Sequence, residues 1–324
     1  MTNIFNCRSL LSPILLGAGL CITISTSVSA GEFPAPTFIT MKLEKTVEKF
    51  PNQTVWKGGP NMLYNSVTPD GKLLFATSPS TGSVYVFNTK TGSTKSIIKA
   101  GKAPKGVKIS PNGKYAYISN EASATISVIK IKTLKVIDTI KVKEKPHNVR
   151  FHNNGKIAYV TLQGGAGLGV IDTTKRKMTH IIPLPGLTGP HNMDLSPDGN
   201  TAFVRDIVNN VAVLDIKTEK VKKIIKVGTG HAGIDVLPDG RYVVTGAIGD
   251  KVVSIIDPVS MSVIKQIDVG TGPHGVRASK NSRWIYVTVT AENKVVVIDA
   301  QSLEIVKKID TGKFPFWVAV RGNA

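Results

Sequence analysis

Short apolar runs separated by polar turn residues fill the chain from about residue 57 onward. The segment 191–227 shows the pattern clearly, because its runs of 5 to 7 residues are rich in Val and Ile and are divided by Gly, Asp, Asn and Pro. The runs are 191–196, 201–205, 211–215 and 221–227. This length and composition indicate β-strands, and no window is long enough for a helix. We expect four antiparallel strands in the unit.

The unit recurs with a nearly constant period. Its copies approximate Gly-x-x-Pro-His-Gly-Val-x-x-Ser-Pro-Asp-Gly, and alignment on the final turn leaves one variable position in each copy. This position is occupied in turn by Leu63, Lys105, His147, His191, Ala232, His274 and Phe316. The intervals are 42, 42, 44, 41, 42 and 42 residues. A period near 40 that contains four strands is typical of a β-propeller blade.

The seven copies predict an all-β, seven-bladed β-propeller of four-stranded antiparallel blades. The seventh copy contains only its first strand, at 316–320, so its other strands must come from the N-terminal stretch around 38–56. Pairing of the N- and C-terminal strands would close the ring and leave no open sheet edge. We expect one propeller domain over residues 31–324.

Several strands carry the wording of a known repeat family. The segments are Tyr117-Ile118-Ser119-Asn120, Tyr159-Val160-Thr161 and Tyr286-Val287-Thr288. They stand where the Tyr-Val-Thr-Asn signature stands in the YVTN-repeat (YncE-like) periplasmic β-propellers, which the chain resembles over about 57–324. The haem d1-type propeller of nitrite reductases is a more distant resemblance. Both imply the architecture, whereas the activity stays open because propellers support unrelated chemistries.

The first 30 residues follow a different pattern. Arg8 precedes the mostly apolar segment 10–24, and Val28-Ser29-Ala30 offers small residues for cleavage before Gly31. These features predict a secretory signal peptide and a periplasmic protein. The apolar segment is short and interrupted, so we expect no transmembrane segment in the mature chain.

Removal of this leader changes what chemistry is available. Cys7 and Cys21 both lie within it, which excludes disulfides, thiolate metal sites and cysteine nucleophiles from the mature chain. Without Arg8, the mature chain has 40 basic and 22 acidic residues, a net charge of +18. Its lysines gather in the third and fourth strands of the blades, which places them on the rim.

The basic rim has two interpretations. It is either an ordinary solvated surface, or a surface that attaches to anionic lipid headgroups, lipopolysaccharide or an acidic protein partner. Nucleic acid binding is disfavoured because no aromatic residues alternate with the lysines to stack on bases.

The histidines concentrate at one position of the repeat. The chain has six, and His147, His191, His231 and His274 lie at the start of four consecutive innermost strands, where they should surround the mouth of the axial channel. Neutral imidazoles suit copper or zinc, so we consider a metal site of His147, His191 and His274, completed by His231 or Asp206. The alternative is structural, with each ring nitrogen bonded to a neighbouring loop carbonyl.

Charged residues accompany the histidines. The loops between second and third strands should bring Glu121, Gln163, Arg205, Asp206 and Glu292 to the same face. Three residues beyond the variable position, the innermost strands carry Lys108, Arg150, Asp194, Asp235 and Arg277. The candidate ligand-binding residues are Lys105, Lys108, Glu121, Arg150, Asp206 and Arg277.

Three function classes fit these residues. The first is a binding or scaffold protein whose hub face holds a small ligand, a metal or a protein partner. The second is a metal-dependent redox or maturation protein that uses copper or a haem d1-related group, although the chain has no Cys-x-x-Cys-His for covalent haem attachment. The third is a lyase or lactonase in which His274 acts as general base beside Glu292.

Overall fold

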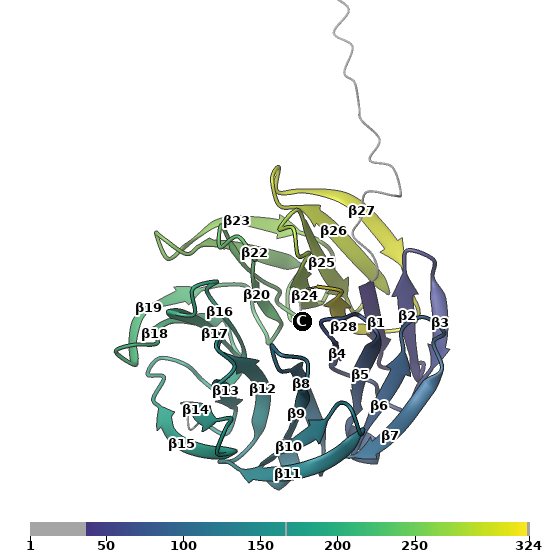
Figure 1. The fold of residues 1–324 in the computed structure, drawn as a ribbon. Coiled ribbons are helices and arrows are strands. Elements are labelled where there is room, and N and C mark those ends of the chain that lie inside the picture. The colour runs from purple at the N-terminus through teal and green to yellow at the C-terminus, as the bar shows by residue number, and fades with distance from the viewer. Residues whose placement is uncertain (1–36, 166, 323–324) are drawn as a thin grey trace, which may run out of the picture. The chain divides into compact units, whose positions relative to one another are not determined.

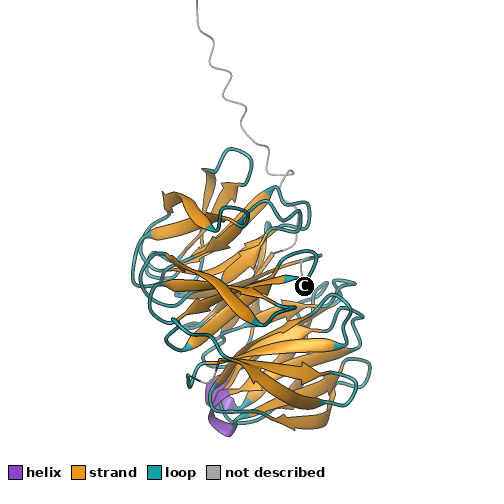
Figure 2. Ribbon diagram, turned by 90° about the vertical axis from the view of Figure 1, so that its left-hand side faces the viewer, coloured by secondary structure: helices purple, strands orange, loops and turns teal. Residues whose placement is uncertain are grey.

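The computed structural model describes residues 37–165 and 167–322, which belong to one compact unit. These residues form seven four-stranded antiparallel sheets that follow one another around an axis, seen end-on in Figure 1 and from the side in Figure 2. The predicted seven-bladed all-β propeller is confirmed. The predicted signal peptide, 1–30, lies outside the described residues.

Each of the first six blades is a continuous stretch of chain whose first strand is innermost. Blade 1 comprises β4 (Asn65–Val67), β5 (Leu73–Ser78), β6 (Ser83–Asn88) and β7 (Thr94–Lys99). Blade 2 comprises β8 (Pro104–Ile109), β9 (Tyr115–Asn120), β10 (Thr125–Lys130) and β11 (Lys135–Lys141). Blade 3 comprises β12 (Pro146–Phe151), β13 (Ile157–Leu162), β14 (Gly167–Asp172) and β15 (Lys177–Ile182).

The remaining blades follow the same order except for the last. Blade 4 comprises β16 (Pro190–Leu195), β17 (Thr201–Asp206), β18 (Asn210–Asp215) and β19 (Lys220–Lys226). Blade 5 comprises β20 (Ile234–Val236), β21 (Val243–Thr245), β22 (Val252–Asp257) and β23 (Ser262–Asp268). Blade 6 comprises β24 (Pro273–Ala278), β25 (Trp284–Val289), β26 (Lys294–Asp299) and β27 (Glu304–Asp310). The short 3-10 helices η1 (Pro79–Thr81) and η2 (Glu121–Ser123) follow β5 and β9.

Blade 7 is assembled from the two ends of the described chain. Its innermost strand is β28 (Pro315–Val320), and its outer strands are β1 (Thr37–Met41), β2 (Thr46–Phe50) and β3 (Thr54–Lys57). Strands β1 and β28 are antiparallel, and Thr37 stands opposite Val320. The predicted ring closure by N- and C-terminal strands is therefore correct.

The hydrophobic core is divided among the interfaces between blades. Buried apolar side chains form seven clusters in the described chain, and each cluster joins neighbouring sheets. In one of them, Tyr117 and Ile126 of blade 2 pack with Val149 and Ala158 of blade 3. Each blade thus buries both faces against its neighbours, so the innermost strands are held rigidly around the axis.

The turns between first and second strands depend on the repeated Asp-Gly or Asn-Gly pair. In blade 4, Asp198 Oδ1 accepts a hydrogen bond of 3.0 Å from the Asn200 amide, and Gly199 has a φ of 76°. A Cβ at Gly199 would lie 2.7 Å from His152 Nε2 of the neighbouring blade. Glycine is therefore required there by backbone conformation and by space.

No helix among the described residues has the length and hydropathy of a membrane span.

Candidate metal centre at the hub

The histidines enter the hub at local irregularities of the innermost strands. In β12, Pro146 pairs with Leu162 and Val149 with Val160, so one extra residue is accommodated between them. Strands β16 and β24 shift register at the equivalent place. Such a bulge redirects the side chains next to it. His147, His191 and His274 each follow the proline that opens the irregular segment.

The imidazoles form an arc across blades 3 to 6. Ring centroids are 3.8 Å apart for His147 and His191, 4.6 Å for His191 and His231, and 5.2 Å for His231 and His274. Phe316 continues the arc, 4.2 Å from His274. Tyr64 lies edge-on between the two ends, 5.2 Å from His147 and 5.3 Å from Phe316. Aromatic rings therefore surround the mouth of the channel.

Three of these histidines bring ligand atoms together. One ring nitrogen from each of His191, His231 and His274 lies within 4.8 Å of the other two. His274 donates through Nδ1 to the Phe316 carbonyl at 2.9 Å, which fixes its tautomer and leaves a lone pair on Nε2. That Nε2 and both ring nitrogens of His191 are buried without a hydrogen-bond partner among the described residues.

His147 is not part of this group, although its ring lies beside that of His191. Its Nδ1 donates to the His191 carbonyl at 3.1 Å, and its Nε2 accepts from the Tyr64 hydroxyl at 3.2 Å. Burial raises the pKa of Tyr64, so its hydroxyl keeps the proton that it donates. Both nitrogens of His147 are therefore occupied. The structure groups His231 with His191 and His274, in place of the His147, His191 and His274 combination expected from the repeat.

The environment keeps the histidines neutral. Burial lowers the pKa of His274 to about 3 and the pKa values of His147 and His191 well below the ordinary value. Burial also lowers the pKa of the half-buried His231, with help from Arg205, Lys42 and Lys105. Neutral imidazole is the form that binds a metal ion.

Asp206 and Arg205 support the loop beside the histidines. Asp206 is completely buried and accepts hydrogen bonds from the Val208 and Asn210 amides at 3.0 and 2.8 Å. Arg205 Nη2 donates to the Gly228 and Gly230 carbonyls, the first at 2.6 Å. Asp206, which was considered as a metal ligand, therefore holds the loop between β17 and β18.

Other candidate residues occupy three different places. Lys105 and Glu121 form an ion pair of 3.3 Å on blade 2. Glu292 is exposed and accepts a hydrogen bond of 2.6 Å from the Thr271 amide. Across the described chain, no hydrogen bond joins Glu292 to His274, the pair considered for acid–base chemistry. The third place lies further along the innermost strands and contains Lys108, Arg150 and Arg277.

Arg150 and Arg277 pair with acidic residues at the same level of the channel. Arg150 Nε lies 2.9 Å from Asp194 Oδ1, and Arg150 Nη2 lies 3.2 Å from Asp235 Oδ1. Arg277 also pairs with Asp235. The structure therefore unites the predicted charged set in one buried layer.

Tyr64 is a site residue that the sequence analysis did not single out. It follows the variable position of blade 1, where three other copies have Gly106, Gly233 or Gly275. A large ring at a position that holds glycine in three of the seven copies was the available signal.

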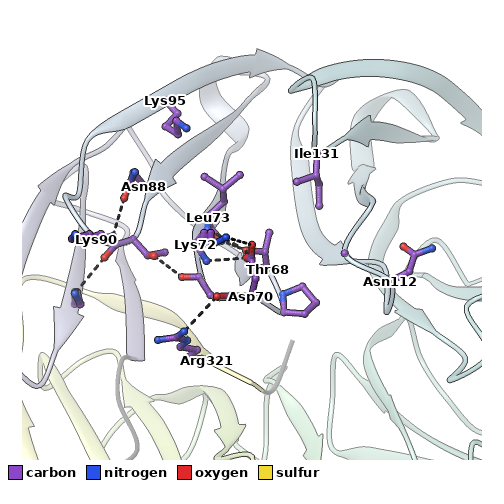
Figure 3. A pocket seen from close by; sticks show the side chains of 15 residues that line it. Thr68, Asp70, Lys72, Leu73, Asn88, Lys90, Lys95, Asn112, Ile131 and Arg321 are labelled. Carbon is purple, nitrogen blue, oxygen red and sulfur yellow. Dashed lines mark hydrogen bonds and ion pairs between the residues drawn. The ribbon is translucent and has the colours of Figure 1, made fainter.

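A cavity of about 860 Å³ lies against the turns of blades 1 and 2 (Figure 3). Asp70 points into it and accepts hydrogen bonds from Thr68 and the Lys72 amide, while Arg321 contacts the Asp70 carbonyl at 3.4 Å. None of these residues was predicted from the sequence to be functional.

Comparison with known proteins agrees with the geometry. Residues 42–205, slightly more than half of the chain, match the family model described as lactonase, 7-bladed β-propeller, and residues 204–324 match that of the YNCE-like β-propeller. The chain belongs to the YncE-like and lactonase-type family of seven-bladed β-propellers. The sequence resemblance to YncE-like propellers is confirmed. No curated protein sequence matched the chain significantly.

Solved structures share this YncE-like fold at low identity. Kuenenia stuttgartiensis hydrazine synthase is 21% identical, with a TM-score of 0.73 over 81% of this chain and 90% of that one. Dihydro-haem d1 dehydrogenase NirN in complex with DHE is 16% identical, with a TM-score of 0.68 over 90% and 77%. A functionally unknown protein of Desulfotomaculum acetoxidans is 16% identical, with a TM-score of 0.75 over 89% and 99%.

Proposed function

We propose that this YncE-like propeller is an exported binding protein that holds a copper or zinc ion at His191, His231 and His274. The observation that carries the proposal is the convergence of three imidazole nitrogens within 4.8 Å. Two of these histidines have buried ring nitrogens that lack hydrogen bonds. Leaving such an atom unsatisfied costs about 1–3 kcal/mol, and coordination would remove that cost.

The spacing of the nitrogens is compatible with coordination after a small adjustment. Zinc binds histidine nitrogen at about 2.0–2.1 Å, which puts two tetrahedral ligands roughly 3.4 Å apart. The three nitrogens, now up to 4.8 Å apart, would move closer by rotation of the rings about their side-chain bonds. Three protein ligands leave a fourth position for a small ligand or a group from a protein partner.

Elemental analysis of the purified protein tests the proposal. Protein exposed to copper or zinc and then desalted should retain about one ion per chain, and the variant His191→Ala with His274→Ala should retain none. His180→Ala is the matched control, because His180 lies on the outer strand β15 and pairs with Glu219 at 2.8 Å. Absence of stoichiometric metal from the unmodified protein would refute the proposal.

A second variant separates the two histidine groupings. His147→Phe removes the residue whose nitrogens are bonded to Tyr64 and to the His191 carbonyl. Metal retention should survive this change. Its loss would favour the grouping of His147, His191 and His274 that the repeat alone suggests.

The match to the lactonase family model favours hydrolysis of a lactone as a second candidate function. A three-histidine site with an open position is the arrangement used by catalytic zinc sites. Zinc-loaded protein should then open aliphatic lactones, and His191→Ala should abolish the activity while Glu292→Gln preserves it. Equal activity after removal of the metal with a chelator would exclude a metal-dependent hydrolase.

Export and surface attachment complete the proposal. Residues 1–30 would direct the chain to the periplasm. Fractionation of cells that produce the chain with and without these residues tests this.

The exposed lysines of β11 and β19 support attachment to an anionic membrane. Co-sedimentation with phosphatidylglycerol vesicles, but not with phosphatidylcholine vesicles, is the expected result.

A further inference from the structure

A second cavity opens at the opposite end of the channel from the histidines. It measures about 480 Å³ and lies where the innermost strands of blades 2 to 5 end. Lys108, Arg150 and Asp194 line its inner wall. Its outer wall contains the turn prolines Pro69, Pro111, Pro197 and Pro238. The lining includes none of the four hub histidines.

The distance along one strand shows that the two sites are separate. His147 stands near the start of β12, and Asn153, just after this strand, lines the cavity. At ~3.3 Å per residue, the six steps from His147 to Asn153 span roughly 20 Å, and the three steps to Arg150 on the inner wall span roughly 10 Å. A ligand in the cavity would therefore not touch an ion held by His191, His231 and His274.

The carboxylates beside the cavity are fully occupied. Asp194 pairs with Arg150 and accepts a hydrogen bond of 3.0 Å from the Val236 amide. Asp235 pairs with Arg150 and Arg277 and accepts a hydrogen bond of 2.7 Å from the Ala278 amide. Each of the four carboxylate oxygens therefore already has an arginine or a backbone amide as partner.

Among the buried cations of this layer, Lys108 remains without a close partner. Its side chain lines the cavity and only 8% of the residue is exposed. Within residues 37–165 and 167–322 it forms neither an ion pair nor a hydrogen bond. The layer thus has three cationic side chains and two carboxylates. A buried ammonium without a partner is unfavourable, and an anion in the cavity would supply the missing one.

The walls indicate what kind of anion fits. Ile109, Leu195, Val236 and the four turn prolines make much of the lining apolar. The buried layer has one positive charge in excess, which matches a single carboxylate better than a phosphate with two charges. Lys280 also lines the cavity, but it is exposed, so water already solvates its ammonium group.

We infer that this cavity binds a small organic carboxylate, whose charged group pairs with Lys108 and whose apolar part lies among the turn prolines. The inference is independent of the proposed metal site. It assigns the chain a second binding site, on the face opposite the histidines. Ligand and metal would be held at the two ends of one channel.

Binding of 4-fluorobenzoate, followed by fluorine NMR, tests the inference. The probe should show a saturable shift with the full chain, and the uncharged 4-fluorobenzamide should bind at least about tenfold more weakly. Inorganic phosphate should also bind more weakly than 4-fluorobenzoate. Equal binding of the amide, tighter binding of phosphate, or no binding of the carboxylate would overturn the inference.

Variants localise the site. Lys108→Met should weaken 4-fluorobenzoate at least about tenfold, and Lys108→Arg should restore much of the binding. Lys114→Met is the matched control, because Lys114 belongs to the same blade and is exposed. Lys108→Gln replaces Lys108→Met if the latter does not fold. Unchanged binding in folded Lys108→Met or Lys108→Gln would overturn the inference. Removal of metal from the wild type should leave 4-fluorobenzoate binding unchanged.

Discussion

The histidines of the repeat differ in their hydrogen bond to the next blade. His147 and His274 each donate through Nδ1 to the carbonyl of the next blade's variable position, His191 or Phe316. At the equivalent place for His191, the Ala232 carbonyl accepts a hydrogen bond of 2.8 Å from Asn192 Nδ2, and the His191 ring nitrogens have no partner among the described residues. The structural interpretation of the repeated histidine, a ring nitrogen bonded to a neighbouring carbonyl, holds for His147 and His274 but not for His191.

The threonine of the Tyr-Val-Thr segments has an identifiable structural task. Thr161 Oγ1 donates to the His191 carbonyl at 2.7 Å and accepts from the Asn148 amide at 2.9 Å. Thr288 does the same with the Phe316 carbonyl at 3.1 Å and the Gly275 amide at 2.7 Å. These bonds hold the bulged segment that presents each histidine and tie it to the next blade.

Thr161→Val should therefore reduce the free energy of unfolding by about 1–3 kcal/mol, because it leaves a buried amide and a buried carbonyl without this partner. Urea denaturation followed by tryptophan fluorescence measures the change. Thr174→Val, at an exposed position of the same blade, is the control and should have little effect. Equal stability of the two variants would contradict the assigned role.

Lys108 should make the free energy of unfolding depend on pH. Burial, with Arg150 and Arg277 nearby, lowers the pKa of Lys108 well below its ordinary value, against the opposing effect of Asp194 and Asp235. In the unfolded chain the lysine pKa is ~10.4, so between the two pKa values the unfolded chain binds more protons than the folded chain does. Stability should accordingly rise with pH across that interval, and the cost of the buried charge is greatest below it.

Denaturation of the wild type and of Lys108→Met from pH 7 to about pH 10 isolates this contribution. The variant should be the more stable protein at neutral pH, and the difference should shrink as the pH rises. Parallel stability curves would show that Lys108 titrates normally.

At the scale of the strands, periodicity predicted most of the architecture. The turn residues and apolar runs located the four strands of blade 4 within one or two residues, and the incomplete seventh copy predicted the composite blade. The bulges after Pro146, Pro190 and Pro273 were beyond this reasoning, because one extra residue reverses side-chain direction without changing composition. The repeat therefore located the four histidines but not the orientation that separates His147 from the others.

Gly199→Ala tests the turn of blade 4. The replacement puts a side chain at a φ of 76° and within 2.7 Å of His152 Nε2, so it should lower stability by about 1 kcal/mol or more. Thermal unfolding measures the loss. His152→Ala in the same chain should restore part of it by making space, and failure to do so would assign the whole cost to backbone conformation.

At the scale of the whole molecule, the proposed metal would join three blades. His191 stands on blade 4, His231 precedes blade 5 and His274 stands on blade 6. An ion that binds only the folded ring stabilises it by about 2.7 kcal/mol at a hundred times its Kd. Zinc or copper should therefore raise the melting temperature of the wild type but not of His191→Ala. An equal rise in both would place the ion elsewhere.

Ring closure should be sensitive to a single buried position. Val318 is completely buried and pairs with Ile39, whereas Val259 is 86% exposed. Val318→Asp buries a charge at the junction and should cost several kcal/mol, seen as a large drop in melting temperature, while Val259→Asp should be nearly neutral. Similar effects would mean that the junction contributes little to stability.

The junction between β1 and β28 also determines how the ring responds to force. Because Thr37 lies opposite Val320, the ends of the two strands that lead out of the ring are side by side. Tension between these two ends acts on the hydrogen bonds of the junction one pair after another, beginning with the outermost pair. Heat must disrupt the junction together with its packed neighbours. A protein-unfolding motor that pulls one end while the other is held therefore meets a lower barrier than thermal unfolding does. The ring should resist heat and yet open readily when it is unfolded from one end.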